Sequence, residues 1–205
     1  MNSKIKSLIE ILIIISVFIF LTYLVQSNIA FFENLIGKTF LGILTYILII
    51  VIAIVVAPIS SIPLIPLVSA VWGWKLAGLI TIVGWTLGSI VAFLLARRYG
   101  VRIVRGLIPL EKIYYIENKI PEENLFLAVI FLRMIIPVDI LSYVLGLFSK
   151  IKFLPYVIAT VVGIIPAVFI LIYIGTIDFI VQLFILLVVG IIVLSGWIVK
   201  EKMSK

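Results

Sequence analysis

Two ionisable residues lie inside the apolar stretch Phe131–Gly146, and they are the strongest candidates for chemistry. Arg133 and Asp139 are six residues apart, with Pro137 between them. A charged side chain in hydrocarbon costs at least about 2.5 kcal/mol on insertion scales, so each charge needs a functional or structural reason. A guanidinium offers phosphate a planar fork of donors, and a carboxylate near it can neutralise that charge or accept a proton.

Pro137 decides how the two charges are placed. Positions six apart on an unbroken helix point roughly 240° apart, so an intact helix keeps Arg133 and Asp139 on different faces. Proline lacks an N–H and pushes the preceding residue out of the helical region, so we expect a break here. One interpretation is a re-entrant helical hairpin with a polar site at its tip. The alternative is a proline-kinked span whose arginine reaches the membrane surface.

The composition is that of a polytopic membrane protein. Of the 205 residues, 65% are hydrophobic and 12% are charged, against roughly 45–50% and 25% in soluble domains. The chain has no cysteine and no histidine, which excludes thiolate or imidazole metal ligands and histidine acid–base catalysis. One carboxylate with scattered serines is not a catalytic constellation, so neither an enzyme nor a cofactor or metal is expected.

We expect a single all-α membrane domain over residues 1–205, with two proline-broken hairpins and about four full spans. Leu125–Ile136 and Val138–Ser149 are each too short to cross and are predicted to be the legs of one hairpin. The other break is predicted at Pro58, Pro63 and Pro66, where Ser60 and Ser61 can bond to freed backbone groups. The full spans are predicted at Leu8–Val25, Leu76–Ala96, Phe153–Ile174 and Phe179–Val199.

Two further signals concern helix ends and helix packing. The sequence Gly73-Trp74-Lys75 indicates a turn at the membrane interface with an aromatic anchor. Gly84 and Gly88 have GxxxG spacing, which favours a helix face for close packing rather than a dimer motif.

The positive charges favour the hairpin interpretation. If both broken segments are re-entrant and the N-terminus is cytoplasmic, thirteen lysines and arginines lie inside, two lie outside and Arg133 is within the membrane. A full span over Leu125–Ser149 would change this split to eight against seven. Because cytoplasmic loops carry an excess of Lys and Arg, we predict both termini in the cytoplasm. The membrane is expected to be the plasma membrane of a prokaryotic cell.

A basic segment follows the Leu76–Ala96 span. Arg98, Arg102 and Arg105 occur at i, i+4 and i+7, on one face of a short helix, and Arg97 adjoins them. This pattern favours a membrane-surface patch that binds anionic lipid. A solvated loop that only fixes the topology explains the same pattern.

The two halves of the chain also share a sequence pattern. Gly88–Gly100 and Gly163–Gly175 each contain glycines twelve residues apart and an alanine four residues after the first glycine. Each segment follows a proline break and a glycine. With the hairpins entering from opposite sides, this pattern indicates the inverted-repeat plan of transporters.

These segments resemble the DedA/VTT-domain superfamily, also called the SNARE-associated Golgi protein family. The resemblance covers about Ala57–Thr176 and is carried by PISSIPLIPLVSAVWG, GWTLGSIVAFLLARRYG and FLRMIIPVDILSYVLGLFSKIKFLPYVIATVVGIIPAVFILIYIGT. It is closest to the Tvp-like branch, whose second motif runs R…P-x-D/N…Y…G. The resemblance implies two oppositely inserted re-entrant hairpins and movement of phospholipids or polyprenyl phosphates between leaflets, with a link to the proton gradient in bacterial members.

The resemblance also points to individual residues. The second motif is matched by Arg133, Pro137, Asp139, Tyr143 and Gly146, and the glycine pattern of the first half by Gly73, Gly84 and Gly88. Many bacterial members have acids in the first hairpin and a second arginine six residues after the first. This chain has no acid between Phe40 and Trp72, and Asp139 stands at the second-arginine position. These departures argue against a twin-arginine phosphate clamp and a conventional proton site.

The leading hypothesis is a lipid flippase or scramblase in which Arg133 binds a phosphate headgroup and Asp139 neutralises Arg133 or takes up a proton. The headgroup path would be lined by Ser60, Ser61, Ser142 and Tyr143. The alternatives are a proton- or cation-coupled carrier of a small solute, and a membrane scaffold without transport activity. The expected partners are membrane lipids with anionic or phosphate headgroups and not nucleic acid. Proton coupling and a homo-oligomer remain open.

Overall fold

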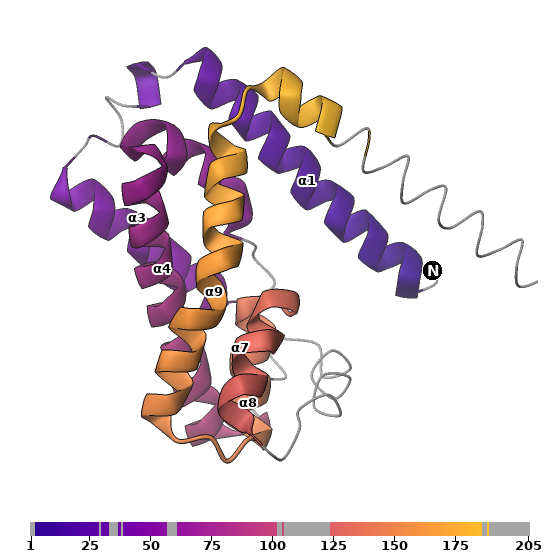
Figure 1. Ribbon diagram of the computed structural model, residues 1–205, viewed down its shortest axis with the longest axis vertical. Helices are drawn as coiled ribbons and strands as arrows, with labels where there is room; N and C mark the ends of the chain where they lie inside the picture. The colour runs from indigo at the N-terminus through magenta and orange to yellow at the C-terminus, as the bar shows by residue number, and fades with distance from the viewer. Residues whose placement is uncertain are drawn as a thin grey trace, which may run out of the picture.

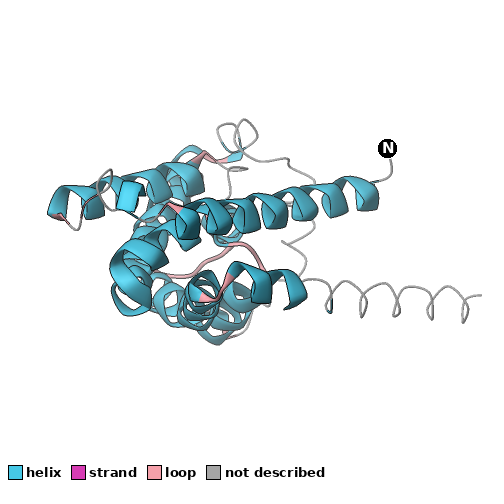
Figure 2. Cartoon of the chain, turned by 90° about the horizontal axis from the view of Figure 1, so that it is seen from above, coloured by secondary structure: helices cyan, strands magenta, loops and turns pink. Residues whose placement is uncertain are grey.

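Every regular element among the described residues is a helix (Figures 1 and 2). The computed structural model describes residues 3–28, 30–32, 37, 39–56, 61–101, 104, 124–185 and 188. This confirms the all-α prediction. The elements are α1 (Ser3–Ser27), α3 (Phe40–Val55), η1 (Ile62–Leu64), α4 (Ile65–Tyr99), α7 (Leu125–Ile135), α8 (Val138–Phe148) and α9 (Phe153–Thr176).

Among the described residues, two helices are long and apolar enough to cross a membrane, by length and composition: Ile62–Tyr99 and Phe153–Thr176. They contain two of the predicted spans. Residues 179–185 are also helical, but most of the predicted span Phe179–Val199 lies outside the described residues. The number of full spans therefore stays a prediction.

The long helix α4 is the element around which the others pack, since α9, α3, α8 and α1 all contact it. It is broken at Gly73, whose φ of 71° and ψ of 160° lie outside the helical region. Glycine adopts a positive φ without steric cost, so the chain turns here and then continues as helix. The predicted interfacial turn at Gly73 coincides with this break.

Close packing of α3 on α4 depends on two glycines. A Cβ added at Gly84 would lie 3.1 Å from Cγ2 of Ile50, and one added at Gly88 would lie 2.8 Å from Cδ1 of Ile54. Both distances are at or below the lower limit of ordinary contacts. The GxxxG pair is thus the surface of α4 on which α3 rests.

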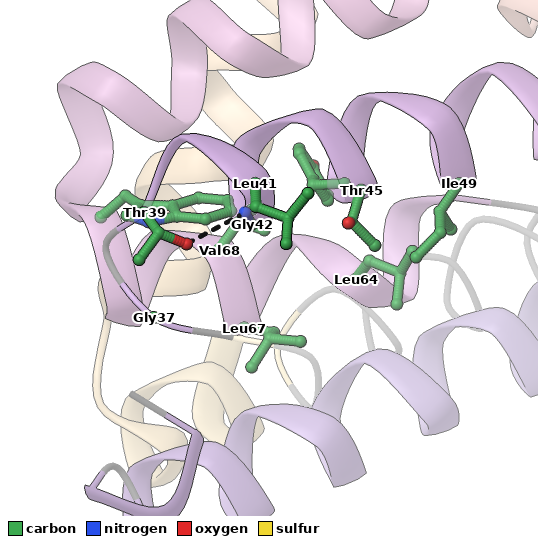
Figure 3. Close-up of a pocket in the computed structure, with 11 residues that line it drawn as sticks. Gly37, Thr39, Leu41, Gly42, Thr45, Ile49, Leu64, Leu67 and Val68 are labelled. Carbon is green, nitrogen blue, oxygen red and sulfur yellow. Dashed lines mark hydrogen bonds between the residues drawn. The ribbon is translucent and has the colours of Figure 1, made fainter. Parts of the chain in front are cut away.

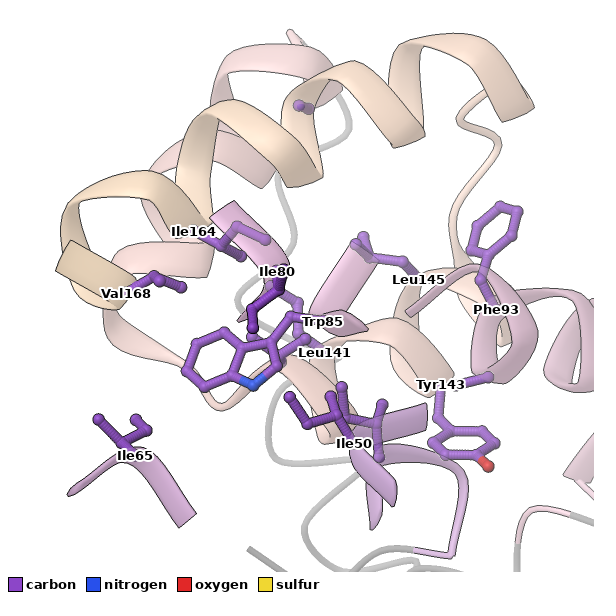
Figure 4. Close-up of a cluster of buried hydrophobic side chains, with 14 of the residues drawn as sticks. Ile50, Ile65, Ile80, Trp85, Phe93, Leu141, Tyr143, Leu145, Ile164 and Val168 are labelled. Atoms are coloured by element: carbon purple, nitrogen blue, oxygen red, sulfur yellow. The ribbon is translucent and has the colours of Figure 1, made fainter. Parts of the chain in front are cut away.

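The core is formed by side chains from α3, α4, α8 and α9. Figure 4 shows Ile50, Trp85, Leu141 and Ile164 converging from these four helices, and all are buried. The outward-facing side chains are also apolar, with large exposed groups on α3, on α7 and after α9. An apolar exterior around an apolar core suits hydrocarbon as the surrounding solvent.

Candidate functional site

Pro137 breaks the chain between α7 and α8, at the predicted position. Helix α7 ends at Ile135, Ile136 has extended backbone with φ −100° and ψ 135°, and α8 begins at Val138. Proline explains this geometry because it cannot donate to the preceding turn and forces its neighbour into the extended region. Arg133 thus lies in the last turn of α7, and Asp139 lies in the first turn of α8.

The guanidinium of Arg133 is buried where α7, α8 and α9 meet, and the residue is only 2% exposed. Its Nη1 donates to the carbonyl oxygen of Val138 at 2.6 Å. Its Nη2 lies within hydrogen-bond distance of three hydroxyl oxygens: Ser142 at 3.0 Å, Tyr156 at 2.9 Å and Thr160 at 3.1 Å. All four acceptors are neutral, so these bonds orient the cation without cancelling its charge.

The donors of Arg133 are not all used. A guanidinium carries five N–H groups, and the four hydrogen bonds involve only Nη1 and Nη2. The Nε atom is buried and has no hydrogen-bond partner among the described residues. The site therefore holds a desolvated cation with donor capacity to spare, which is a suitable arrangement for receiving an anion.

Two of the Arg133 ligands, Tyr156 and Thr160, come from α9 and were not predicted. The Tyr156 hydroxyl accepts from Arg133 and donates to the carbonyl oxygen of Ser89 in α4 at 2.9 Å. A glycine at 163 lets α9 approach, because a Cβ there would lie 2.7 Å from Cβ of Arg133. Residues 156, 160 and 163 are spaced four and three apart, so they form one face of α9. That spacing was visible in the sequence.

Asp139 is not among the partners of the four Arg133 hydrogen bonds. It lies in the first turn of α8, on the same helix as Tyr143. Tyr143 is fully buried and donates to the carbonyl oxygen of Val55, at the end of α3, at 2.6 Å. Asp139 as the counter-charge of Arg133 stays a prediction, while Tyr143 connects the two halves of the chain.

The first proline break lies only partly within the described residues, because Pro58 and Ser60 fall outside them. Pro63 is in η1, and Pro66 opens α4. The hydroxyl of Ser61 accepts a hydrogen bond from the indole N–H of Trp85 at 3.1 Å. Of the predicted path residues within the described chain, Ser142 bonds directly to Arg133, whereas Ser61 and Tyr143 bond elsewhere.

Two residues of the predicted basic patch, Arg97 and Arg98, lie within the described part of the chain, and their guanidinium groups have different contacts. Arg97 donates to two backbone carbonyl oxygens in the connector between α8 and α9, those of Ile151 at 2.8 Å and Ser149 at 2.6 Å. Its guanidinium also lies 4.4 Å from the ring centre of Phe93, which stacks on Tyr156 with ring centres 3.9 Å apart. Arg98 is exposed, and Arg102 and Arg105 lie outside the described residues. Arg97 thus binds the backbone of the α8–α9 connector. The stacked rings of Phe93 and Tyr156 lie between Arg97 and Arg133, whose guanidinium donates to the Tyr156 hydroxyl.

Replacing Arg97 with methionine should therefore loosen the α8–α9 connector. Methionine keeps most of the apolar side-chain volume but cannot donate to the carbonyl oxygens of Ser149 and Ile151. We expect faster hydrogen–deuterium exchange of the backbone amides around residues 149–153. Arg98→Met is the matched control, because Arg98 is the neighbouring exposed arginine and its guanidinium lies over the Tyr99 ring instead. Equal acceleration in both variants would contradict this role for Arg97.

The fold and the site define an all-helical membrane protein in which a proline-broken pair of short helices holds a buried arginine against a third helix. Residues 58–177 match the VTT domain, and the chain belongs to this family. The matched segment contains both proline breaks, Gly73 and Arg133. Comparison with curated proteins and with solved structures gave no match. The predicted family is confirmed, and the Tvp-like branch stays a prediction.

Proposed function

We propose that this protein moves a lipid with a phosphate headgroup, a phospholipid or a polyprenyl phosphate, between the two leaflets of the membrane. Membership of the VTT-domain family supports a role in membrane transport. The observation that carries the proposal is Arg133, a buried cation whose four hydrogen bonds go to neutral oxygens and whose Nε–H has no partner among the described residues.

The physical argument concerns the charge of the headgroup. A phosphate entering hydrocarbon loses its hydration, and this loss is the main barrier to its crossing. A guanidinium fixed within the membrane lowers the barrier by supplying an opposite charge and spare donors. Because Arg133 is 2% exposed, a headgroup reaches it when the α7–α8 pair moves away from α9. Asp139 then acts as the counter-charge of Arg133 when no lipid is bound, or as a proton acceptor.

The path also depends on two re-entrant hairpins that enter from opposite sides. Helices α7 and α8 have 11 residues each, which is about 17 Å of helix against about 30 Å of hydrocarbon. Each half of the described chain runs in the same order: a helix, a proline break, a short helix, and a long helix. Hairpins that meet near the midplane would shorten the hydrophobic distance a headgroup travels.

Topology is tested by labelling single cysteines, which is clean because the chain has no cysteine of its own. With both termini cytoplasmic and α7–α8 forming a re-entrant hairpin, Ser7→Cys and Ser149→Cys should react with a membrane-impermeant maleimide from the same side. A cysteine at Lys75 should react from the other side and serves as the internal control. Labelling of positions 7 and 149 from opposite sides would restore the proline-kinked span.

The function itself is tested with purified protein in liposomes. We expect translocation of a fluorescent phosphate-headgroup lipid above the rate of protein-free liposomes, with and without a pH gradient as separate arms. A rate that depends on the gradient assigns proton coupling. Solute uptake without lipid movement would favour the small-solute carrier. Neither lipid nor solute movement would favour the scaffold.

A further inference from the structure

A pocket far from Arg133 in the sequence lies between α3 and the start of α4. Its volume is about 420 Å³, which is within the usual range for small-molecule sites. Figure 3 shows Leu41, Thr45 and Ile49 on one face of α3, with Leu64 and Leu67 contributed by the facing segment. The three α3 residues are four apart, so the pocket follows the helix for about 12 Å.

The pocket has a buried floor and an open rim. The floor contains Tyr46, Val68 and Trp72, all buried, and the rings of Tyr46 and Trp72 meet edge to face with centres 5.8 Å apart. The rim contains Leu41 and Thr45, which are exposed. A long, narrow site with an aromatic floor and an aliphatic rim suits a hydrocarbon chain.

The polar groups of the pocket are donors without formal charge. The described residues that line it include no aspartate, glutamate, lysine or arginine. The hydroxyl oxygen of Thr39 accepts from the backbone N–H of Gly42 at 3.2 Å, which leaves the Thr39 hydroxyl proton for another acceptor. The indole N–H of Trp72 is buried without a partner among the described residues. Both donors suit an uncharged acceptor such as an ester carbonyl, and no described lining residue carries a positive charge to offset a phosphate.

The residues around the pocket indicate which kind of ligand can enter it. The side chains of Phe40 and Leu41 beside the rim are 75% and 72% exposed, so this face of α3 borders hydrocarbon. Trp72 is followed by the break at Gly73 and by Trp74 and Lys75, whose ammonium lies 5.5 Å from the Trp74 ring centre. Tryptophan and lysine mark the membrane interface, which is the depth of lipid ester groups. The pocket therefore runs from the interface into one leaflet.

We infer that this pocket binds the ester end of a glycerolipid. The ester carbonyl lies at the Thr39 and Trp72 end, and the acyl chain follows Thr45 and Ile49 toward Leu64. The site recognises the neutral part of a lipid, whereas the proposed function rests on the phosphate and Arg133. It goes beyond the proposed function, because a lipid bound here is held whether or not the protein transports it.

The first test locates the acyl chain. Purified protein in detergent is exposed to a phosphatidylcholine carrying a photoreactive diazirine in one acyl chain, and labelled residues are identified by mass spectrometry. Label is expected at residues 45–49 and 64–67. Thr45→Trp fills the pocket and should remove most of it, whereas Leu48→Trp, at a position 59% exposed on the same helix, should not. Equal labelling of the two variants would overturn the site and leave only lipid adsorbed to the outer surface.

The second test concerns the ester carbonyl of the bound lipid. A dialkyl ether lipid keeps the chains but lacks the ester acceptor. We expect the ester lipid to compete for the site roughly 2- to 10-fold better than the ether lipid, as one neutral hydrogen bond implies, and Trp72→Phe should reduce the difference. Equal competition in the native protein would overturn the assignment. Binding is measured without transport, so labelling with no translocation would refute only the proposed function, and translocation with no labelling only this site.

Discussion

Replacing Arg133 with leucine is expected to lower translocation of a phosphate-headgroup lipid by roughly 10- to 100-fold, the range implied by losing a hydrogen bond to a charged group. The reason is that no cation remains within the membrane to offset the headgroup charge. Arg133→Lys should keep part of the rate, because an ammonium still attracts phosphate but lacks the planar fork. The measurement is the initial rate of translocation in liposomes, normalised to the amount of folded protein.

Arg133→Leu should lower the folded yield if Asp139 is its counter-charge, but two of the groups that bind the guanidinium keep hydrogen-bond partners without it. Ser142 also donates to the Val138 carbonyl oxygen at 2.6 Å, and Tyr156 also donates to the Ser89 carbonyl oxygen. These two ligands keep partners when Arg133 is removed, and normalising the rate to folded protein separates the loss of rate from any loss of fold. An Arg133→Leu variant that elutes as folded protein and moves lipid at the native rate would make Arg133 purely structural.

Variants of Asp139 test whether its carboxylate compensates the charge of Arg133. If it is the counter-charge of Arg133, Asp139→Leu alone leaves a buried cation uncompensated and should lower the folded yield, since breaking a buried pair costs about 3–5 kcal/mol. The double variant Arg133→Leu/Asp139→Leu should recover much of that yield and translocate no faster than Arg133→Leu. A double variant with no better yield than Asp139→Leu would show that Asp139 does not compensate Arg133.

The second large effect is expected at Gly146, where α8 meets α4. A Cβ added there would lie 2.5 Å from the carbonyl oxygen of Phe93 and 2.6 Å from Cβ of Ala96. Backbone atoms cannot turn aside, so Gly146→Ala must push the two helices apart. We expect a loss of about 1–3 kcal/mol in the free energy of unfolding, as overpacking usually gives. The measurement is the thermal midpoint of the folded fraction in detergent.

Gly78→Ala is the matched control for Gly146→Ala. A Cβ at Gly78 would also be close to its neighbour, 2.7 Å from Cε1 of Phe169, but the neighbour is the end of a side chain that can turn. The better helix propensity of alanine, about 1 kcal/mol over glycine, offsets the remaining strain. We therefore expect a near-native midpoint. Similar decreases of the thermal midpoint in the two variants would mean that the backbone contact at Gly146 does not cause the loss of stability.

Much of the fold could be predicted because local chemistry determines it. Proline at 137 disfavours the helical backbone of Ile136, and the chain breaks there, whereas Pro166 lies inside α9. Glycine at 73 tolerates a positive φ, and α4 is broken there. The apolar composition predicted a membrane protein with helices throughout, and the VTT-domain match confirms the family. The re-entrant insertion of the hairpins depends on which side of a membrane each loop faces, so it stays a prediction until the labelling is done.

The ligands of Arg133 were harder to predict because they come from a distant helix. Tyr156 and Thr160 are 23 and 27 residues from Arg133, and only the packing of α9 against α7 brings them to the guanidinium. The sequence instead suggested the nearby opposite charge, Asp139. The hydrogen bonds of Arg97 to the α8–α9 connector could not be predicted either, since charge patterning does not reveal that backbone carbonyl oxygens lie within its reach. Its place in a lipid-binding surface stays a prediction.

The most direct test of the account is whether a phosphate reaches Arg133. The Nε–H of this residue lacks a partner among the described residues, so its ¹H–¹⁵N NMR resonance should report an arriving acceptor. The chain has five arginines, and Arg133→Lys assigns the signal by its disappearance. We predict that the resonance shifts progressively when phosphatidic acid is added to the protein in detergent and is unchanged by diacylglycerol, which has the same chains without the phosphate. An unchanged resonance at saturating phosphatidic acid, in a preparation that translocates lipid, would contradict the account.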